Sequence, residues 1–411
     1  MFNLPLFVGI DYHQETIQVC VMDQTRKILV NRSVKNDPEA VFRVVAPYGS
    51  NVHVAIEAST GVADFAEILI ERHRWNVELA HPGYVNRMKQ TPDKSDWTDA
   101  KILADLTRVG YIPRVWLAPK QIRDLRDLVR HRHGLSEQRK QAKLRLRALL
   151  RHHRIVPPHR PWTIKGKQWL LDSKNISSPH VLFLLQDHCD TIEYFDKKIS
   201  AVENKMWQDV ADDPVVKLLL CQVGIGPITA VTMRAIIGRF DRFRTGKQLA
   251  HFCAVCPRNN SSAGKATTGG LIKAGDDLLR QVLIEAAHRL IRYDPHWRAM
   301  ANRLRANGKK TCVIVAAVAN RWIRKLFHQM VDGNPSGEMT EGFSRHDQKS
   351  NLESAVESKP SDAGTQSPQA PEVRCDRHFS GTAIPSPVAP QQSRRPFRET
   401  NKTTQRGAKK I

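Results

Sequence analysis

The chain has 411 residues, enough for two or three domains that each bury a hydrophobic core. Lys and Arg total 64 against 41 Asp and Glu, and the net charge of +23 predicts a polyanionic partner, for which nucleic acid is the usual one. No stretch is long and apolar enough to span a bilayer, and the first residues lack the basic region and cleavage site of a signal peptide. We therefore expect no membrane partner.

The seven cysteines are scattered and odd in number, which is typical of a reducing cytoplasm rather than of a disulfide framework. Cys253 and Cys256 form a CxxC pair, but no second pair follows at the spacing of a zinc site. We expect both to be buried thiols, which leaves metal binding there as the weaker alternative.

Short apolar runs alternate with turn residues over roughly the first 80 positions. They predict strands at residues 4–11, 16–22, 27–34, 52–56 and 77–80, with helices at residues 38–46 and 61–73. Three strands come first, and helices then alternate with the remaining strands. This order predicts an α/β layer with an antiparallel meander at one side, as in the RNase H-like fold.

Four acids occupy informative positions in this layer. Asp11 ends the first predicted strand and Glu57 follows the fourth, where open α/β sheets place their ligands. Asp96 and Asp99 lie three residues apart at the start of a predicted helix, so both carboxylates point to one face. On their own, these two are better explained as first-turn acids that favour the helix dipole. With the strand-end acids they predict a site for Mg²⁺ or Mn²⁺, because these cations prefer carboxylate oxygens.

Residues 120–154 are strongly basic and predict a long helix with a heptad stripe, and a second heptad helix follows a connector at residues 155–178. The two helices would form an antiparallel hairpin or pair with another protomer, and the sequence leaves both open. Few acids lie near the basic faces of the first helix, so we expect it to contact nucleic-acid phosphates. The residues assigned to this contact are Arg130, Arg132, Arg139 and Lys143.

The next segment contains VGIGP at residues 223–227, between two predicted helices. Its backbone N–H groups would suit a phosphate, although a plain helix–helix turn explains the glycines equally well. A polar loop at residues 258–270 presents Ser261, Ser262 and Lys265, and taken alone it is best explained as a surface loop. Helices are expected at residues 276–292 and 311–331.

Composition shifts again beyond residue 333, where Pro, Ser, Thr and Gln replace aliphatic residues. Such a segment buries too little apolar surface to order itself, so we expect a disordered tail. The predicted organisation has four regions. They are a catalytic α/β domain at residues 1–112, a basic coiled-coil arm at 113–212, a mainly helical domain at 213–333 and the tail at 334–411.

Three motifs together carry a family resemblance. They are VGIDYH; the pair AIEASTG and KSDWTDAKILA; and GIGPITA followed by PRNNSSAGKATTGGLIKAGDDLLRQVLIEAA. Over roughly residues 7–330 the chain resembles the DEDD transposases of bacterial insertion sequences, the group described as bridge-RNA-guided recombinases. The resemblance implies a RuvC-like domain, a coiled-coil arm and a C-terminal transposase domain in a bacterial cytoplasmic protein. It also implies double-stranded DNA and a structured bridge RNA as partners, within a homo-oligomer, either a dimer or a tetramer.

The resemblance implies roles for particular residues. The acid tetrad corresponds to Asp11, Glu57, Asp96 and Asp99, as catalytic metal ligands. The nucleophilic serine corresponds to Ser262, eleven residues before Lys273. It would attack the scissile phosphate in a composite site shared by two protomers. Lys265 and Lys273 are assigned to nucleic-acid contact.

Two departures from the family pattern concern the serine segment. The usual Ser-Ser-Gly-Gly is replaced by SSAG at residues 261–264, so Ser261 remains an alternative nucleophile. The motif's Ile followed by Ser or Thr is replaced by Leu271 and Ile272. Two other functions compete with the recombinase. One is a Holliday-junction-resolving nuclease that uses water as the nucleophile, and the other is a non-catalytic nucleic-acid-binding scaffold.

Overall fold

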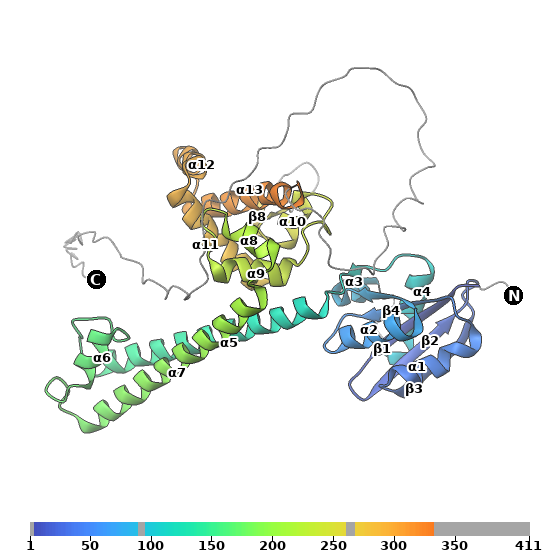
Figure 1. Ribbon diagram of the computed structural model, residues 1–411, viewed down its shortest axis with the longest axis horizontal. Coiled ribbons are helices and arrows are strands. Elements are labelled where there is room, and N and C mark those ends of the chain that lie inside the picture. Colours follow the sequence, from blue (N-terminus) through green and yellow to red (C-terminus); the bar gives the residue numbers. More distant parts are fainter. Residues whose placement is uncertain (1–3, 89–94, 260–267, 333–411) are drawn as a thin grey trace, which may run out of the picture. The chain divides into compact units, whose positions relative to one another are not determined.

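A computed structural model describes residues 4–88, 95–259 and 268–332 (Figure 1). Its N-terminal part contains a six-stranded sheet in the order β3-β2-β1-β4-β5-β6. The strands β1, β2 and β3 form an antiparallel meander, β4 and β5 continue it in parallel with β1, and β6 pairs antiparallel at the edge. The strands are β1 (Leu6–Tyr12), β2 (Thr16–Met22), β3 (Ile28–Lys35), β4 (Val52–Glu57), β5 (Asn76–Ala80) and β6 (Arg114–Val115).

Helices cover both faces of this sheet. On one face, α1 (Pro38–Val45) and α2 (Val62–His73) bury valines and Phe65 against alternate apolar residues of β1 and β4. On the other face, α4 (Asp96–Arg108) packs its Ala100 and Ala104 against β2 and its Leu103 against β4. A short helix, α3 (Pro82–Met88), follows β5, and η1 (Ala46–Tyr48) follows α1.

The close packing of α4 on β1 depends on the missing side chain of Gly9. A Cβ atom at residue 9 would lie 1.9 Å from the carbonyl oxygen of Ala100 and 2.4 Å from the backbone nitrogen of Ala104. Real Cβ atoms do not approach backbone atoms this closely, so only glycine fits here. Gly9 thereby fixes how near the first turn of α4 comes to the end of β1.

Two long helices pack antiparallel as a hairpin within the chain, which is the first of the two arrangements that the heptad pattern allowed. These are α5 (Lys120–His152) and α7 (Pro179–Val210), which run side by side in Figure 1. Leu146 and Leu150 of α5 bury against Leu185 and Cys189 of α7, and α6 (Ile164–Leu171) closes this cluster. At its other end the hairpin packs into the helices that follow.

Six helices and a two-stranded sheet make up the described part of the chain beyond residue 213. One continuous core joins them with Leu125 and Val129 of α5 and with Met206 and Val210 of α7. The elements are α8 (Pro214–Leu220), α9 (Pro227–Ile237), α10 (Gly246–Phe252), β7 (Pro257–Asn259), β8 (Thr268–Leu271), α11 (Asp277–Tyr293), α12 (Pro295–Ala306) and α13 (Thr311–Asp332). None of the helices in the described ranges combines the length and apolarity needed to cross a membrane.

The α/β layer and the helical C-terminal part agree with the sequence prediction, with strand and helix ends shifted by one or two residues. The structure adds η1, α3, α6, α10, α12, the strand β6 and the pair β7–β8, which the sequence pattern did not predict. Most of these elements have eight residues or fewer, so they show too little hydrophobic periodicity to stand out from connectors. The expected tail at residues 334–411 lies outside the described residues.

We predict that Gly9→Ala destabilises the folded chain by about 1–3 kcal/mol, because the added methyl group overpacks α4 against β1. A matched control is Gly134→Ala in the exposed middle of α5, where an added Cβ would meet no atom within 4 Å. That control should stabilise the chain by about 0.5–1 kcal/mol, because alanine favours helix over glycine. Thermal unfolding of both variants checks this, and equal stability of the two would contradict the packing argument.

Candidate active site

The first turn of α4 carries two acids beside the end of β1. Ser95 caps this helix, since its hydroxyl accepts a hydrogen bond of 3.2 Å from the backbone N–H of Thr98. Asp96 is exposed and Asp99 is buried, so the second acid faces the sheet. Buried carboxylates are uncommon without a compensating interaction, which makes this turn a candidate functional position.

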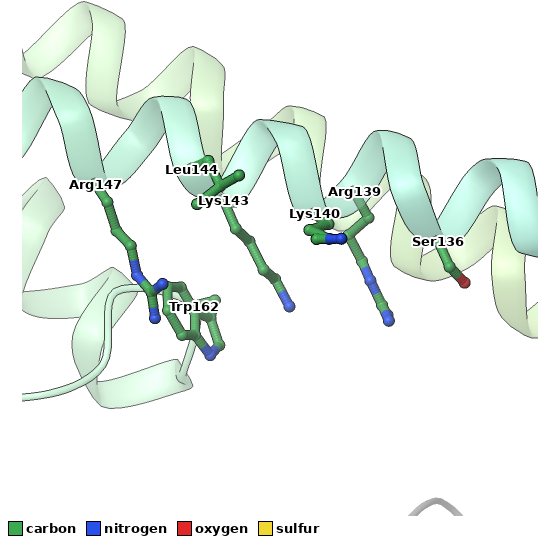
Figure 2. A pocket seen from close by; sticks show the side chains of 7 residues that line it. All are labelled: Ser136, Arg139, Lys140, Lys143, Leu144, Arg147 and Trp162. Carbon is green, nitrogen blue, oxygen red and sulfur yellow. The ribbon is translucent and has the colours of Figure 1, made fainter. Parts of the chain in front are cut away.

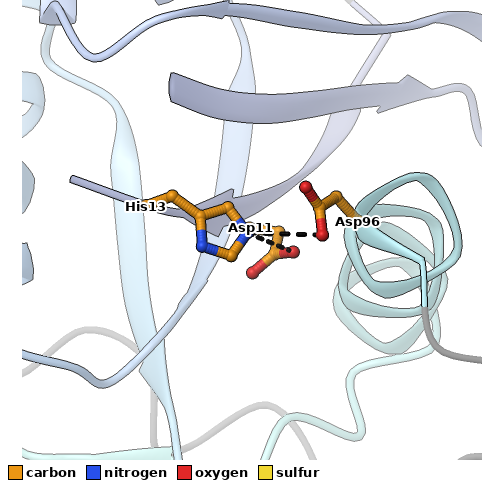
Figure 3. A group of neighbouring side chains, drawn as sticks. All are labelled: Asp11, His13 and Asp96. Carbon is orange, nitrogen blue, oxygen red and sulfur yellow. Dashed lines mark hydrogen bonds and ion pairs between the residues drawn. The ribbon is translucent and has the colours of Figure 1, made fainter. Parts of the chain in front are cut away.

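Asp11, at the end of β1, lies next to this turn. Figure 3 shows the His13 ring facing the Asp11 and Asp96 carboxylates, with its Nε2 atom 3.3 Å from Asp11 Oδ2 and 3.4 Å from Asp96 Oδ1. One ligand atom from each of the three residues lies within 4.8 Å of the other two. The structure therefore brings together two of the acids predicted from sequence and adds a histidine.

The pKa of Asp11 responds to His13 and Asp96, and also to Asp99. Burial raises the pKa of the Asp11 carboxyl, and the nearby charges of Asp96 and Asp99 raise it further. His13 lowers this pKa, both through its charge and through its hydrogen bond. Three carboxyl groups thus share one small region, and holding them there costs free energy because like charges repel one another.

Glu57, the fourth predicted acid, ends β4 and lies one residue beyond the register pair of Ile10 and Ile56. Its strand position is therefore adjacent to that of Asp11. Side chains alternate along a strand, and Ala55, two residues earlier, packs toward α4. Glu57 consequently belongs to the same face of the sheet as Gly9, Asp11 and α4.

Sequence reasoning missed the residues that hold α4 against the meander. The side-chain amide of Asn31 on β3 donates to the backbone oxygen of Trp97 at 3.0 Å, and the buried Gln18 of β2 donates to Asn31 Oδ1 at 2.6 Å. Gln18 is also the register partner of Asp11. Gln18 and Asn31 are polar residues on the face of β2 and β3 that α4 covers. Their positions indicate this contact only once the strand register is known.

Two of the arginines assigned to nucleic-acid contact pair with acids on the opposite helix of the hairpin. Arg132 donates to Glu203 Oε1 through Nε at 2.9 Å and through Nη2 at 2.7 Å, and Arg139 donates to Asp196. The sequence argument counted acids near these arginines along one helix. It could not anticipate acids that α7 supplies across the antiparallel pair.

The remaining basic residues have different surroundings. Arg130 is exposed and lies 3.8 Å from Asp276, Lys143 has its Nζ atom 5.3 Å from the centre of the Trp162 ring, and Lys273 is exposed after β8. Among the assigned residues that lie in the described ranges, Lys143 is therefore the one with a cation–π contact. Contact of any of them with nucleic acid stays a prediction.

The serine segment lies outside the described residues, and with it Ser261, Ser262 and Lys265. The structure describes the two strands that flank this segment in sequence, β7 and β8, which pair antiparallel. Cys253 is fully buried and Cys256 is partly buried, both as free thiols. Burial raises the pKa of both thiols, as expected for structural cysteines.

Comparison with known proteins identifies two matching family models. The model of the DEDD transposases of the IS110 type matches residues 8–155, which include the β1 to α5 region. The model of the transposase IS116/IS110/IS902 family matches residues 216–302, from α8 to α12. The two matches therefore cover both the acidic cluster and the helical C-terminal part.

Several curated proteins are similar over most of their length. A Sinorhizobium fredii protein named as a transposase, y4qE, is 28% identical over 349 residues, covering 75% of this chain and 86% of the relative. A Pseudomonas aeruginosa protein named as a family 20 transposase is 26% identical, with 69% and 84% covered. The transposase for insertion sequence element IS1328 of Yersinia enterocolitica is 24% identical, with 68% and 82% covered. With the two family matches in the same order along the chain, these relatives show that the chain belongs to the DEDD-type insertion-sequence transposases.

Proposed function

We propose that the N-terminal sheet and its helices form an RNase H-like, RuvC-like catalytic domain in which Asp11, Glu57, Asp96 and Asp99 bind Mg²⁺ or Mn²⁺. In this role the chain breaks and rejoins DNA at the ends of an insertion sequence. The antiparallel meander continued by parallel strands supports the proposed fold. The observation that carries the proposed site is the convergence of Asp11, Asp96 and Asp99 at the end of β1, in a chain of the transposase family.

The donor set fits a hard divalent cation. Asp11 and Asp96 are held at one small site, and Asp99 is near enough to raise the pKa of Asp11. Carboxylate oxygens are the ligands that Mg²⁺ and Mn²⁺ prefer, and a cation among them would relieve their repulsion. When bound, the metal would polarise the scissile phosphate and neutralise the charge that develops on it.

We propose Ser262 as the nucleophile. A bond forms between its Oγ atom and phosphorus, the Oγ proton is lost, and one bond between phosphorus and a sugar oxygen breaks, with that oxygen leaving as a protonated hydroxyl. The number of phosphoester bonds is unchanged, so the strand can be rejoined without an external energy source. Lys265 and Lys273 would neutralise the phosphate charge during this exchange. Family resemblance supports this assignment, with Ser261 as the alternative.

The proposed partners follow from charge and resemblance. Double-stranded DNA fits a chain with a net charge of +23, and a structured bridge RNA would select the DNA sites by base pairing. A homo-oligomer, dimer or tetramer, would complete the active site by bringing the acids of one protomer to the serine of another. On α5, Arg130, Arg132, Arg139 and Lys143 would contribute phosphate contacts.

We predict that Asp11→Asn and Asp99→Asn each reduce DNA strand exchange by roughly 100-fold or more, because each removes a ligand at the charged centre of the reaction. The raised pKa of Asp11 means that its ionisation costs more in the folded than in the unfolded chain. Stability is therefore lost as pH rises through that pKa, and Asp11→Asn should hold or raise the thermal midpoint at neutral pH. Strand-exchange assays and thermal melts measure the two effects.

Glu15→Gln is the matched control, because it removes an exposed carboxylate from the β1–β2 turn without touching the cluster. It should leave strand exchange unchanged. Normal strand exchange by either asparagine variant would show that the substituted acid has no role in the reaction. A strong loss of stability in Asp11→Asn would show that the carboxylate has a structural role instead.

We further predict that Mn²⁺ or Mg²⁺ stabilises the wild-type chain, by about 2–3 kcal/mol at a concentration roughly 100 times Kd, since binding to the folded state alone shifts the unfolding equilibrium. Asp99→Asn should lose most of this gain. Thermal melts with and without each cation, using Ca²⁺ and a monovalent salt as comparisons, make the measurement. An equal shift in wild type and variant would place cation binding elsewhere.

Ser262→Ala should retain nucleic-acid binding but lose cleavage and strand transfer, whereas Ser261→Ala should keep a measurable part of both. A water-using nuclease does not need either hydroxyl, so this pair of variants separates the recombinase from a junction-resolving nuclease. Reaction with a nicked substrate, followed by proteolysis and mass spectrometry, should yield a nucleotide-linked peptide that contains Ser262. A linked peptide from another segment, or normal cutting by Ser262→Ala, would reject this nucleophile.

A further inference from the structure

The end of the hairpin that α6 closes carries a basic surface, which is separate from the acidic cluster described above. Between residues 138 and 171 the sequence contains ten Lys and Arg residues and no Asp or Glu. Part of this surface forms a hollow of about 310 Å³ on α5. Its lining residues are Ser136, Arg139, Lys140, Lys143, Leu144, Arg147 and Trp162.

Three of the lining cations form one row along the helix. Arg139, Lys143 and Arg147 are spaced four residues apart, which puts them on one face with a rise of about 6 Å between neighbours. Figure 2 shows their side chains extending from the same side of α5. Arg151 occupies the next position of this row in sequence. Such a row offers repeated positive charge along a line, which suits a ligand with repeated negative charge.

Trp162, in the segment that precedes α6, holds two of these cations. The guanidinium carbon of Arg147 lies 4.6 Å from the centre of the indole ring and the Nζ atom of Lys143 lies 5.3 Å from it. Trp162 itself packs partly into the apolar cluster at this end of the hairpin, so its ring is fixed. Cation–π contacts restrict long side chains without neutralising their charge. The two cations are therefore positioned and still available to an anion.

The cations of the hollow differ in how far the protein neutralises them. Arg139 pairs with Asp196, and Lys140 with Glu137. Lys143 and Arg147, by contrast, form no ion pair with any residue in the described ranges. Burial lowers the pKa of Lys143, and the nearby charges of Arg139 and Arg147 lower it further. The charge of Asp196 raises this pKa and only partly offsets these effects. Four cations crowded beside two acids cost free energy that an external polyanion would offset.

The Ser136 hydroxyl lines the hollow, but its oxygen is buried and makes no hydrogen bond within the part of the chain that the structure describes. The donors that the hollow offers to an anion are therefore the charged groups of its lysines and arginines, which suit phosphate oxygens.

We propose that this hollow, within the function proposed above and resting on it, binds the phosphodiester backbone of nucleic acid through Lys143 and Arg147, which Trp162 holds in place. The contact is to phosphates and is independent of base sequence. Within the hollow the contact falls mainly on these two residues, because Arg139 and Lys140 are already paired with acids. Duplex DNA and a structured RNA present the same phosphate chemistry, and the experiment separates them.

The test compares two double variants of the full chain that remove equal charge. Lys143→Gln with Arg147→Gln alters the hollow, whereas Arg145→Gln with Lys198→Gln alters two exposed cations of the same hairpin outside it. Binding to a labelled DNA duplex and to a labelled RNA stem-loop is measured by fluorescence anisotropy over a series of salt concentrations. The slope of log affinity against log salt counts the phosphates that the protein neutralises.

The hollow variant should flatten the slope by about 1.8 on duplex DNA, at about 0.9 for each lost phosphate contact, if the backbone bound is that of DNA. If the backbone is that of RNA, the flattening appears with the stem-loop and is absent with the duplex. The control variant should leave both slopes near those of the wild type. Equal flattening by the two variants, or an unchanged slope on both nucleic acids, would overturn the proposal.

Trp162→Leu and Trp162→Phe test the positioning role of the ring. Loss of the aromatic face should weaken binding a few-fold, while phenylalanine should restore most of it, because cation–π attraction survives on a smaller ring. A thermal melt identifies any variant that fails to fold, and the arginine and lysine variants then decide the proposal by themselves. Failure of the acidic site would appear as normal strand exchange by Asp11→Asn, whereas failure of this binding site would appear as an unchanged salt slope in the hollow variant, so the two results are distinguishable.

Discussion

The arrangement of the acidic cluster depends on how closely a helix can approach a strand. At residue 9 the chain has no side chain, and the backbone of α4 occupies the space that a Cβ would need. The facing positions on α4 are also small, since Ala100 and Ala104 are fully buried there. This contact sets the distance between the end of β1 and the first turn of α4. Asp11 and Asp96, 85 positions apart in sequence, become neighbours because of it.

Apolar packing of the sheet stabilises the fold and offsets the destabilising effect of the acid cluster. Valine and isoleucine side chains on the opposite face of the sheet are fully buried, and burial of this kind contributes about 25 cal/mol per Å² of apolar surface. The acid cluster works against it, because burial and like charges both raise the pKa of Asp11. Contacts such as that from Asn31 to the Trp97 carbonyl keep the first turn of α4 in position despite the repulsion. The site is thus held by its surroundings more than by its own interactions.

The sequence predicted the parts of this site that follow from local patterns. Alternating apolar residues located the strands, and Asp11 and Glu57 followed as strand-end acids. Asp96 and Asp99 were placed at the start of a predicted helix, where α4 begins. His13, Gln18 and Asn31 could not be assigned in the same way, because their contacts depend on strand register and on the depth at which α4 packs. The heptads predicted both helices of the hairpin. The partners of Arg132 and Arg139 became evident only from the antiparallel pairing, since that pairing decides which residues of α7 face them.

The hairpin also shows why a net charge alone says little about where a polyanion binds. Arg132 and Arg139 of α5 pair with acids of α7, and these pairs contribute little to the field beyond a Debye length of about 8–10 Å. From Lys140 outward, α5 itself has no acid, and the connector to α6 adds none. Acids of α7 pair with Arg139 and Lys167 at this end, but the cations of residues 138–171 outnumber them. The excess positive charge of the arm is therefore concentrated toward the end that carries Trp162. A charged ligand responds to this local excess, because screening removes most of the influence of cations farther away.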